Sequence, residues 1–366
     1  MGISLSQMFP PSAKFTEKEV PDQTGKVFIV TGGASGIGLE LVQILYAHNA
    51  KVYVAARSED KAAKAIETVK TKYPKSQGEM IFLHFDLDDL TLVKQSAEKF
   101  LSMETKLDVL WNNAGVMVPP QGTKTKQNYE AQLGTNCVGP FLFTKLVTPL
   151  LVETAKTAPT GTVRVVWVSS SAAGLTAPKG GVDMKNLDYN HDESIWYKYG
   201  ASKAGNILHG AEYAKRYQAA NVVSVPLDPG FLRTELQRHM TGLTSLIFYL
   251  ISQTPIHGAY TELWAGLSPK VTPKDTGAFV IPWGRFGSLR KDIAASTKSK
   301  SEGGTGVGEQ FWEWSEKQVQ PYVTNDNALI VATATAMNGK VAAPIDQKKK
   351  KQEQNGSRGS WSSQPK

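Results

Sequence analysis

Short apolar segments alternate with helix-forming segments along most of this chain. Seven of them are rich in β-branched and aromatic residues, at 26–32, 51–57, 80–87, 107–115, 163–171, 222–230 and 278–284. Nearly continuous apolar strands separated by helices predict a parallel sheet that is covered on both faces. We therefore expect an α/β fold in which a doubly wound parallel sheet of about seven strands forms a single domain.

The alternation also predicts the boundaries of that domain. We place it at 25–325, after a polar leader at 1–24 and before a disordered basic tail at 326–366. Residues 235–275 break the rhythm with two helix-like apolar segments, and we expect this region to form a lid over the substrate. It follows the sixth strand, at the sheet edge where ligands bind in such folds.

Composition excludes several classes of protein. Hydrophobic residues make up 41% of the 366 residues and charged residues 20%, which is typical of a soluble globular protein. No apolar run is long enough to predict a transmembrane span, and no secretory signal is evident. A single cysteine, Cys137, excludes an internal disulfide and favours a reducing, cytoplasmic compartment.

The net charge of +8 does not indicate nucleic-acid binding. Residues 340–366 alone hold seven Lys/Arg against two Asp/Glu, so most of the excess lies in the tail. A solvated appendix is the simplest interpretation of such a tail. We expect neither a nucleic-acid partner nor a metal site.

A glycine-rich turn, TGGASGIG, follows the first strand and opens the first helix. The glycines Gly32, Gly36 and Gly38 would let the backbone approach a pyrophosphate at the helix N-terminus. No lysine follows Gly38, which disfavours a P-loop. The alternative is a glycine turn that binds no ligand.

The end of the second strand predicts which dinucleotide would bind. An acidic residue there would favour the ribose 2′-hydroxyl of NAD, but this chain has Arg57, with Lys61 one turn later. Two cations favour the 2′-phosphate of NADP(H). The alternative is an ordinary surface arginine.

Two further polar residues end neighbouring strands. Asp86 would accept a hydrogen bond from the adenine amino group or would cap the helix expected at 88–99; both interpretations are open. Asn113 ends the fourth strand, where its amide would bind ribose or backbone.

Tyr199 and Lys203 lie four residues apart, so they share one face of a helix. An ammonium group beside a phenol favours the phenolate. Lowering a phenol pKa from about 10 to about 7 needs roughly 4 kcal/mol, which a desolvated lysine would largely supply. This pair is a candidate acid/base unit.

Five motifs follow one another in register: Thr31-Gly32-x-x-x-Gly36-x-Gly38, Asn112-Asn113-Ala114-Gly115, Ser170, Tyr199-x-x-x-Lys203 and Pro229-Gly230. In order and spacing they resemble the short-chain dehydrogenase/reductase family. The resemblance implies a Rossmann-type sheet. The long interval from Ser170 to Tyr199 and the segment 235–290 are similar to the retinol-dehydrogenase-like branch and its fungal biosynthetic relatives.

The resemblance also implies roles for individual residues. Tyr199 would be the general acid/base, Ser170 would hold the substrate oxygen, Lys203 would bind the nicotinamide ribose, and Asn136 would support Lys203 in a proton relay. The backbone of Ile37 would contact the pyrophosphate, and Leu232 and Thr234 the nicotinamide end. Strand register favours Ser170 as the catalytic serine, while counting back from Gly174 favours Ser171.

Together these observations predict an NADP(H)-dependent oxidoreductase. It would move a hydride between nicotinamide and the carbonyl or secondary alcohol of a small, lipophilic substrate, in a step of fungal secondary metabolism. A homo-oligomer is left open. The competing interpretation is a non-catalytic dinucleotide-binding sensor or scaffold on the same fold.

Overall fold

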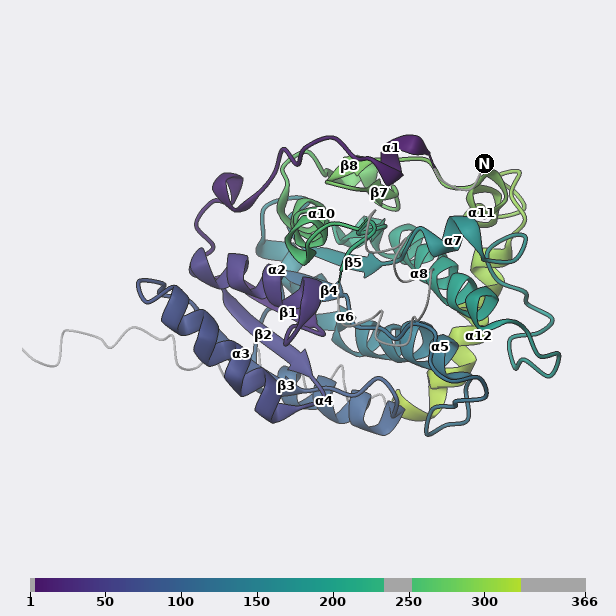
Figure 1. Ribbon diagram of the computed structural model, residues 1–366, viewed down its shortest axis with the longest axis horizontal. Helices are drawn as coiled ribbons and strands as arrows, with labels where there is room; N and C mark the ends of the chain where they lie inside the picture. The colour runs from purple at the N-terminus through teal and green to yellow at the C-terminus, as the bar shows by residue number, and fades with distance from the viewer. Residues whose placement is uncertain (1–3, 234–251, 324–366) are drawn as a thin grey trace, which may run out of the picture.

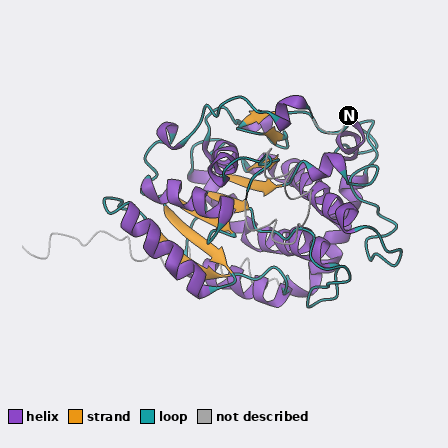
Figure 2. Ribbon diagram, viewed as in Figure 1, coloured by secondary structure: helices purple, strands orange, loops and turns teal. Residues whose placement is uncertain are grey.

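The computed structural model of this protein describes residues 4–233 and 252–323. Thr234, residues 235–251 of the expected lid and the expected basic tail lie outside the described residues. The figures show a sheet between two layers of helices (Figures 1 and 2).

The sheet has eight strands in the order β3-β2-β1-β4-β5-β6-β7-β8. Their bounds are Val27–Thr31 (β1), Lys51–Ala56 (β2), Glu79–His84 (β3), Val109–Asn112 (β4), Arg164–Val168 (β5), Val223–Leu227 (β6), Val280–Ile281 (β7) and Arg285–Phe286 (β8). All neighbours pair in parallel except β7 and β8. The doubly wound parallel sheet is confirmed, and the eighth strand is a two-residue antiparallel addition that is too short to leave a periodic pattern.

Helices cover both faces of the sheet. One layer holds α2 (Gly36–Ala47), α3 (Glu59–Lys72) and α10 (Pro255–Leu267), and the other holds α4 (Leu90–Met103), α6 (Gly139–Thr157) and α8 (Ile195–Tyr217). The strand side chains alternate between these layers, so Trp111 packs against the first and Trp167 against the second. Both indole rings are fully buried. This two-sided burial explains why the strands read as continuous apolar runs.

Strand β1 pairs with β2 on one side and with β4 on the other. The chain order reverses at this point, and the crossovers on either side leave the sheet in opposite directions. A crevice therefore opens beyond the carboxyl ends of β1 and β4, the usual ligand position in open α/β sheets.

The C-terminal helix α12 (Val307–Val319) packs outside α6 and α8. Trp312 lies edge-on to Phe141, with ring centroids 4.7 Å apart, and the Arg216 guanidinium stacks over its ring. Among the described helices, the stretch Ala131–Thr157 is long and apolar enough to span a membrane, but 83% of its apolar window is buried inside the fold. It is a core helix here.

The described part of the expected lid region contains a core helix. Residues 255–267 form α10, which packs along α2 and over the sheet face, and its Leu263 and Ala265 are fully buried. A helix that supplies the core in this way cannot open as a lid. The apolar spacing of this segment serves the core.

The expected leader is part of the folded domain. It forms α1 (Leu5–Met8) and a short 3₁₀ turn at Glu17–Glu19, and Phe15 and Val20 are buried against the core. Tyr260 of α10 donates a hydrogen bond to Glu17 at 2.8 Å. In Figure 1, α1 lies beside β7 and β8, at the far end from β3.

Candidate active site

The crevice at the carboxyl ends of the strands is a cavity of about 430 Å³. Its walls come from the glycine turn after β1, from the ends of β2 and β3, and from the chain after β4. Most of the residues predicted to bind the dinucleotide line it: Gly32, Gly36, Ile37, Arg57, Lys61, Asp86 and Asn113.

The glycine turn depends on its glycines for two physical reasons. Gly32 and Gly36 have φ of +71° and +56°, which other residues rarely adopt. At Gly38 a Cβ would lie 2.6 Å from Asn113 Nδ2 and 2.6 Å from Gly32 O. The resulting turn presents the N-terminus of α2 to the cavity, as a pyrophosphate requires, so the cradle fits a dinucleotide.

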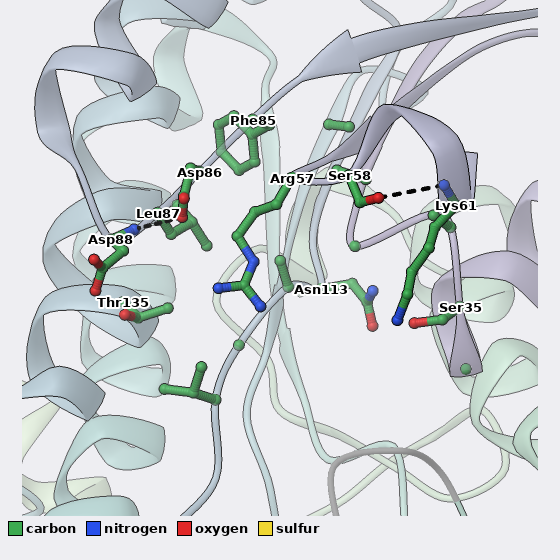
Figure 3. Close-up of a pocket in the computed structure, with 18 of the residues that line it drawn as sticks. Ser35, Arg57, Ser58, Lys61, Phe85, Asp86, Leu87, Asp88, Asn113 and Thr135 are labelled. Carbon is green, nitrogen blue, oxygen red and sulfur yellow. Dashed lines mark hydrogen bonds between the residues drawn. The ribbon is translucent and has the colours of Figure 1, made fainter. Parts of the chain in front are cut away.

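Arg57 and Lys61 both reach this cavity (Figure 3). Figure 3 shows the Arg57 guanidinium between Asp86 and Asp88 on one side and Lys61 on the other. Burial and the neighbouring Asp86 raise the pKa of Asp88, while Arg57 lowers it. The cavity mouth therefore holds both cations and carboxylates, and cations lie where the ribose end of a dinucleotide would arrive.

Asp86 does not cap the following helix. That cap is Asp89, whose side chain accepts a hydrogen bond from Thr91 N at 2.9 Å. Asp86 instead accepts from Asp88 N at 3.0 Å and faces the cavity. Of the two interpretations, the ligand-facing one agrees with this geometry.

Asn113 is anchored to the backbone of β1. Its side chain donates to Thr31 O at 2.7 Å, and its own N–H donates to Thr31 Oγ1 at 2.9 Å. The asparagine thus ties the end of β4 to the glycine turn and fixes the width of the crevice.

A second cavity of about 210 Å³ adjoins the first, and both are lined by Ile37, Asn113 and Gly115. Ser170, Tyr199 and Lys203 line its polar side. Apolar side chains complete the lining: Met117, Leu175, Trp196, Phe231 and Leu232. Of the described residues in this lining, Lys203 alone carries a charge.

Tyr199 and Lys203 lie on one face of α8, as predicted. The Lys203 ammonium is 6.0 Å from the centre of the Tyr199 ring, and both side chains are buried. Lys203 Nζ donates to Val168 O at 3.1 Å. Ser170 lines the same cavity, and its hydroxyl lies close enough to the Tyr199 phenol to lower the pKa of that group.

The expected lowering of the Tyr199 pKa is wrong for the protein groups alone. Burial raises the pKa of Tyr199 to about 12, with the Ser170 hydroxyl opposing it and the Asp228 charge adding to it. Burial likewise lowers the pKa of Lys203 to about 8. Desolvation outweighs the attraction that the spacing of the pair suggested, so the phenol is protonated at neutral pH.

Asn136 lies in a π-helical turn, Gly134–Val138, directly before α6. Its side chain donates to Ser202 Oγ at 2.9 Å and to Val116 O at 3.0 Å, and accepts from Val116 N at 2.8 Å. A Cβ at Gly115 would lie 2.9 Å from Asn136 Oδ1 and 3.3 Å from Lys203 Nζ. The asparagine and the lysine therefore meet behind Gly115.

The three consecutive serines have different partners. Ser169 donates to Lys203 O at 2.6 Å, and Ser171 is the buried residue that begins the short helix α7 (Ala172–Leu175). Ser170 is the serine whose hydroxyl lowers the pKa of Tyr199, and its Oγ accepts a hydrogen bond from Ala172 N at 3.2 Å. The strand register that favoured Ser170 agrees with this arrangement.

Three residues near the site gave no recognised signal in the sequence. Trp196 lies one helical turn before Tyr199, with ring centroids 6.2 Å apart, and this spacing could have been noticed. Asp228 directly precedes Pro229, and its position at a strand end could also have been noticed. Gln7 lies in the N-terminal segment, far from the other site residues in sequence. Only the tertiary structure brings it near Asp228.

The site consists of two adjoining cavities. One is a pyrophosphate cradle, and the other is lined by Ser170, Tyr199 and Lys203. This arrangement is typical of an oxidoreductase that uses a nicotinamide dinucleotide. The short chain dehydrogenase family model matches residues 26–182. A short-chain dehydrogenase/reductase of Phomopsis amygdali is 51% identical over 323 residues, 87% of this chain and 96% of that protein. The pkfC protein of Emericella nidulans is 49% identical, covering 86% of this chain and 98% of that protein. This chain belongs to the short-chain dehydrogenase/reductase family.

Solved structures agree on the fold. A protein from Mycobacterium paratuberculosis superimposes with a TM-score of 0.60 at 25% identity, over 84% of this chain and 98% of that one. NADPH-bound carbonyl reductase from chicken fatty liver gives a TM-score of 0.55 at 20% identity, over 73% and 100%.

Proposed function

We propose that this protein is an NADP(H)-dependent reductase acting on a carbonyl group of a small, lipophilic substrate, or on the corresponding secondary alcohol in reverse. The observation that carries the proposal is that Ser170, Tyr199 and Lys203 line one wall of a largely apolar cavity that adjoins the dinucleotide cleft. The test is NADPH oxidation with a panel of ketones and aldehydes.

The bound dinucleotide would supply or take the hydride. Ser170 and Tyr199 would hold the substrate oxygen between their hydroxyl groups. Since the phenol is protonated at neutral pH, Tyr199 is ready to donate its proton to an oxygen that gains negative charge. Lys203, held by Val168 O and placed near Asn136, would bind the ribose and then share in returning a proton to the tyrosine.

Arg57 supports NADP(H) over NAD(H) in this proposal. Arg57→Ala is expected to raise the KM for NADPH by about 10- to 100-fold, because a charge-assisted bond to the 2′-phosphate is worth about 1.5–3 kcal/mol. The KM for NADH should not change. Initial rates with both cofactors measure this, with Lys64→Ala, an exposed lysine on the helix α3 that follows Arg57, as the control. Equal wild-type efficiency with NADH would contradict the assignment.

Trp196 supports a lipophilic substrate. Its ring is 40% exposed although it lines the cavity beside Tyr199, so a substrate could cover it. Trp196→Ala is expected to raise the KM for lipophilic ketones about tenfold, since an aromatic contact is worth about 1–1.5 kcal/mol. The KM for NADPH should stay constant. Tyr197→Ala, the next residue along and outside the cavity lining, is the matched control, and equal effects in both variants would refute the contact.

The proposal includes a step in fungal secondary metabolism, which the fungal origin of the relatives supports. A cytoplasmic location stays a prediction from the sequence, and a homo-oligomer stays open.

A further inference from the structure

A buried carboxylate, Asp228, lies behind the catalytic serine and has no role in the chemistry above. It directly follows β6 and precedes Pro229-Gly230, whose residues line the substrate cavity. Only 1% of its surface is exposed. A carboxylate is buried at a cost of several kcal/mol unless hydrogen bonds compensate it, so its partners show what it stabilises.

Groups from three segments approach this carboxylate. Gly230 N donates to Asp228 Oδ1 at 3.0 Å. The strand end that carries Ser170 is adjacent, because Ser169 N donates to Leu227 O at 2.7 Å. The backbone of Ser171 and the side chain of Gln7 lie close enough to the carboxylate to lower its pKa. Asp228 thus joins the Pro229-Gly230 turn, the turn that carries Ser170, and the N-terminal helix α1.

The orientation of Gln7 follows from its other contacts. Its side chain is buried, and its Oε1 accepts from Ser4 N at 3.0 Å and from Ser4 Oγ at 3.2 Å. The amide nitrogen is therefore the group left to face Asp228. Arg285 of β8 binds the carbonyl of the adjacent Ser6, so α1 is attached at two points.

The charge of Asp228 affects the pKa of Tyr199. Burial raises the pKa of Asp228 to about 6, while the three groups that approach it oppose this rise. Tyr199 of α8 is the titratable group that faces it, and the Asp228 charge raises the pKa of that phenol. The other packed elements, α1, α7 and β7, carry no charged side chain. The carboxylate is therefore ionised at neutral pH, where it accepts hydrogen bonds most strongly.

We propose that Asp228 is a positioning residue that orients the Ser170–Ser171 turn, and that the N-terminal segment completes the active site by holding Asp228 through Gln7. This inference rests on the proposed function. It explains why a segment outside the matched range 26–182 is folded against the catalytic end of the sheet.

Asp228→Asn and Gln7→Leu test the proposal. An asparagine amide places a donor where a backbone N–H already donates, so we expect kcat to fall about tenfold while the KM for NADPH stays constant. Gln7→Leu should lower kcat in the same direction. Leu5→Ala and Phe9→Ala are the controls, because both side chains are largely exposed at the same helix and should not affect kcat.

The pH dependence separates positioning from a general loss of structure. Wild-type kcat should fall as pH decreases through about 6, because protonated Asp228 accepts hydrogen bonds less strongly. Gln7→Leu removes an interaction that favours the ionised form of Asp228. It should therefore move the acidic decrease in kcat to higher pH. Asp228→Asn should abolish this decrease. An unchanged acidic decrease in both variants would overturn the proposal.

Limited trypsin digestion gives a readout that does not depend on reductase activity. Lys14 is exposed while the next residue, Phe15, is buried, so cleavage after Lys14 requires release of the N-terminal segment. Both variants should be cut there several-fold faster than wild type and the two controls. Unchanged cleavage, or faster cleavage with normal kcat, would overturn the proposal. Wild-type protein that reduces no carbonyl compound would instead refute the proposed function. The digestion result would still test whether Gln7 and Asp228 hold the N-terminal segment in place.

Discussion

Tyr199→Phe is expected to lower kcat by about three orders of magnitude, within the range that general acid–base catalysis contributes. In the proposed mechanism the phenol donates a proton to a substrate oxygen that Ser170 also holds, and both residues line the same cavity. Phenylalanine keeps the ring and its packing. Steady-state NADPH oxidation with the best carbonyl substrate measures the loss.

NADPH binding should survive this substitution, because the cradle at Gly32, Gly36 and Gly38 lies in the other cavity. Fluorescence titration of NADPH gives the Kd of the variant. Tyr197→Phe, which removes a phenol two residues earlier on the same helix, is the matched control and should keep full turnover. If Tyr199→Phe turned over as fast as wild type, the mechanism would be wrong. Wild-type protein that binds NADPH but reduces nothing would favour the sensor or scaffold interpretation.

Arg164→Leu is expected to destabilise the fold by about 3–5 kcal/mol, because it leaves several buried carbonyl groups without donors. The Arg164 guanidinium is buried on β5 and donates to four backbone oxygens at 2.8–3.0 Å: Gly161 O, Ala265 O, Ser268 O and Val271 O. Ala265 lies in the last turn of α10, so the arginine caps that helix and ties it to the sheet. Burial lowers its pKa to about 10, which still leaves it charged at neutral pH.

Urea unfolding followed by circular dichroism measures this effect. Arg164→Lys keeps the charge but cannot reach four acceptors, and it should fall between wild type and the leucine variant. Lys156→Leu, at an exposed ion pair on α6, is the control and should change stability by less than about 0.5 kcal/mol. A loss below about 1 kcal/mol in Arg164→Leu would show that water replaces the guanidinium.

Much of the fold could be predicted because its signals are local. Each of the seven expected strands overlaps an observed strand, and the strand–helix alternation alone implied their parallel arrangement. The turn from Thr31 to Gly38 was predictable for a similar reason, since glycines at strand–helix junctions have few other uses. The pairing of Tyr199 with Lys203 follows from helix geometry, which needs no tertiary information.

The packing of residues 255–267 and of residues 4–24 could not be predicted, because a single sequence does not show which apolar faces are in contact. Spacing in residues 255–267 is equally compatible with a lid helix and a core helix, and only the packing of α10 against α2 decides. A short segment such as 4–9 is too short to show a hydrophobic periodicity, so the sequence does not indicate which of its side chains is buried. Gln7 is buried because Asp228 and Arg285 lie where they do.

The sequence by itself determined the class of fold, the glycine turn after the first strand and the placing of Tyr199 and Lys203 on one helix face, since each depends on residues close together in the chain. The tertiary structure decided the quantities that depend on surroundings. It showed that burial holds the Tyr199 phenol protonated, and that Ser170 is the serine whose hydroxyl opposes this rise in the pKa. The physical reason is that desolvation and hydrogen bonding are summed over every neighbour in space, and most of those neighbours are distant in sequence.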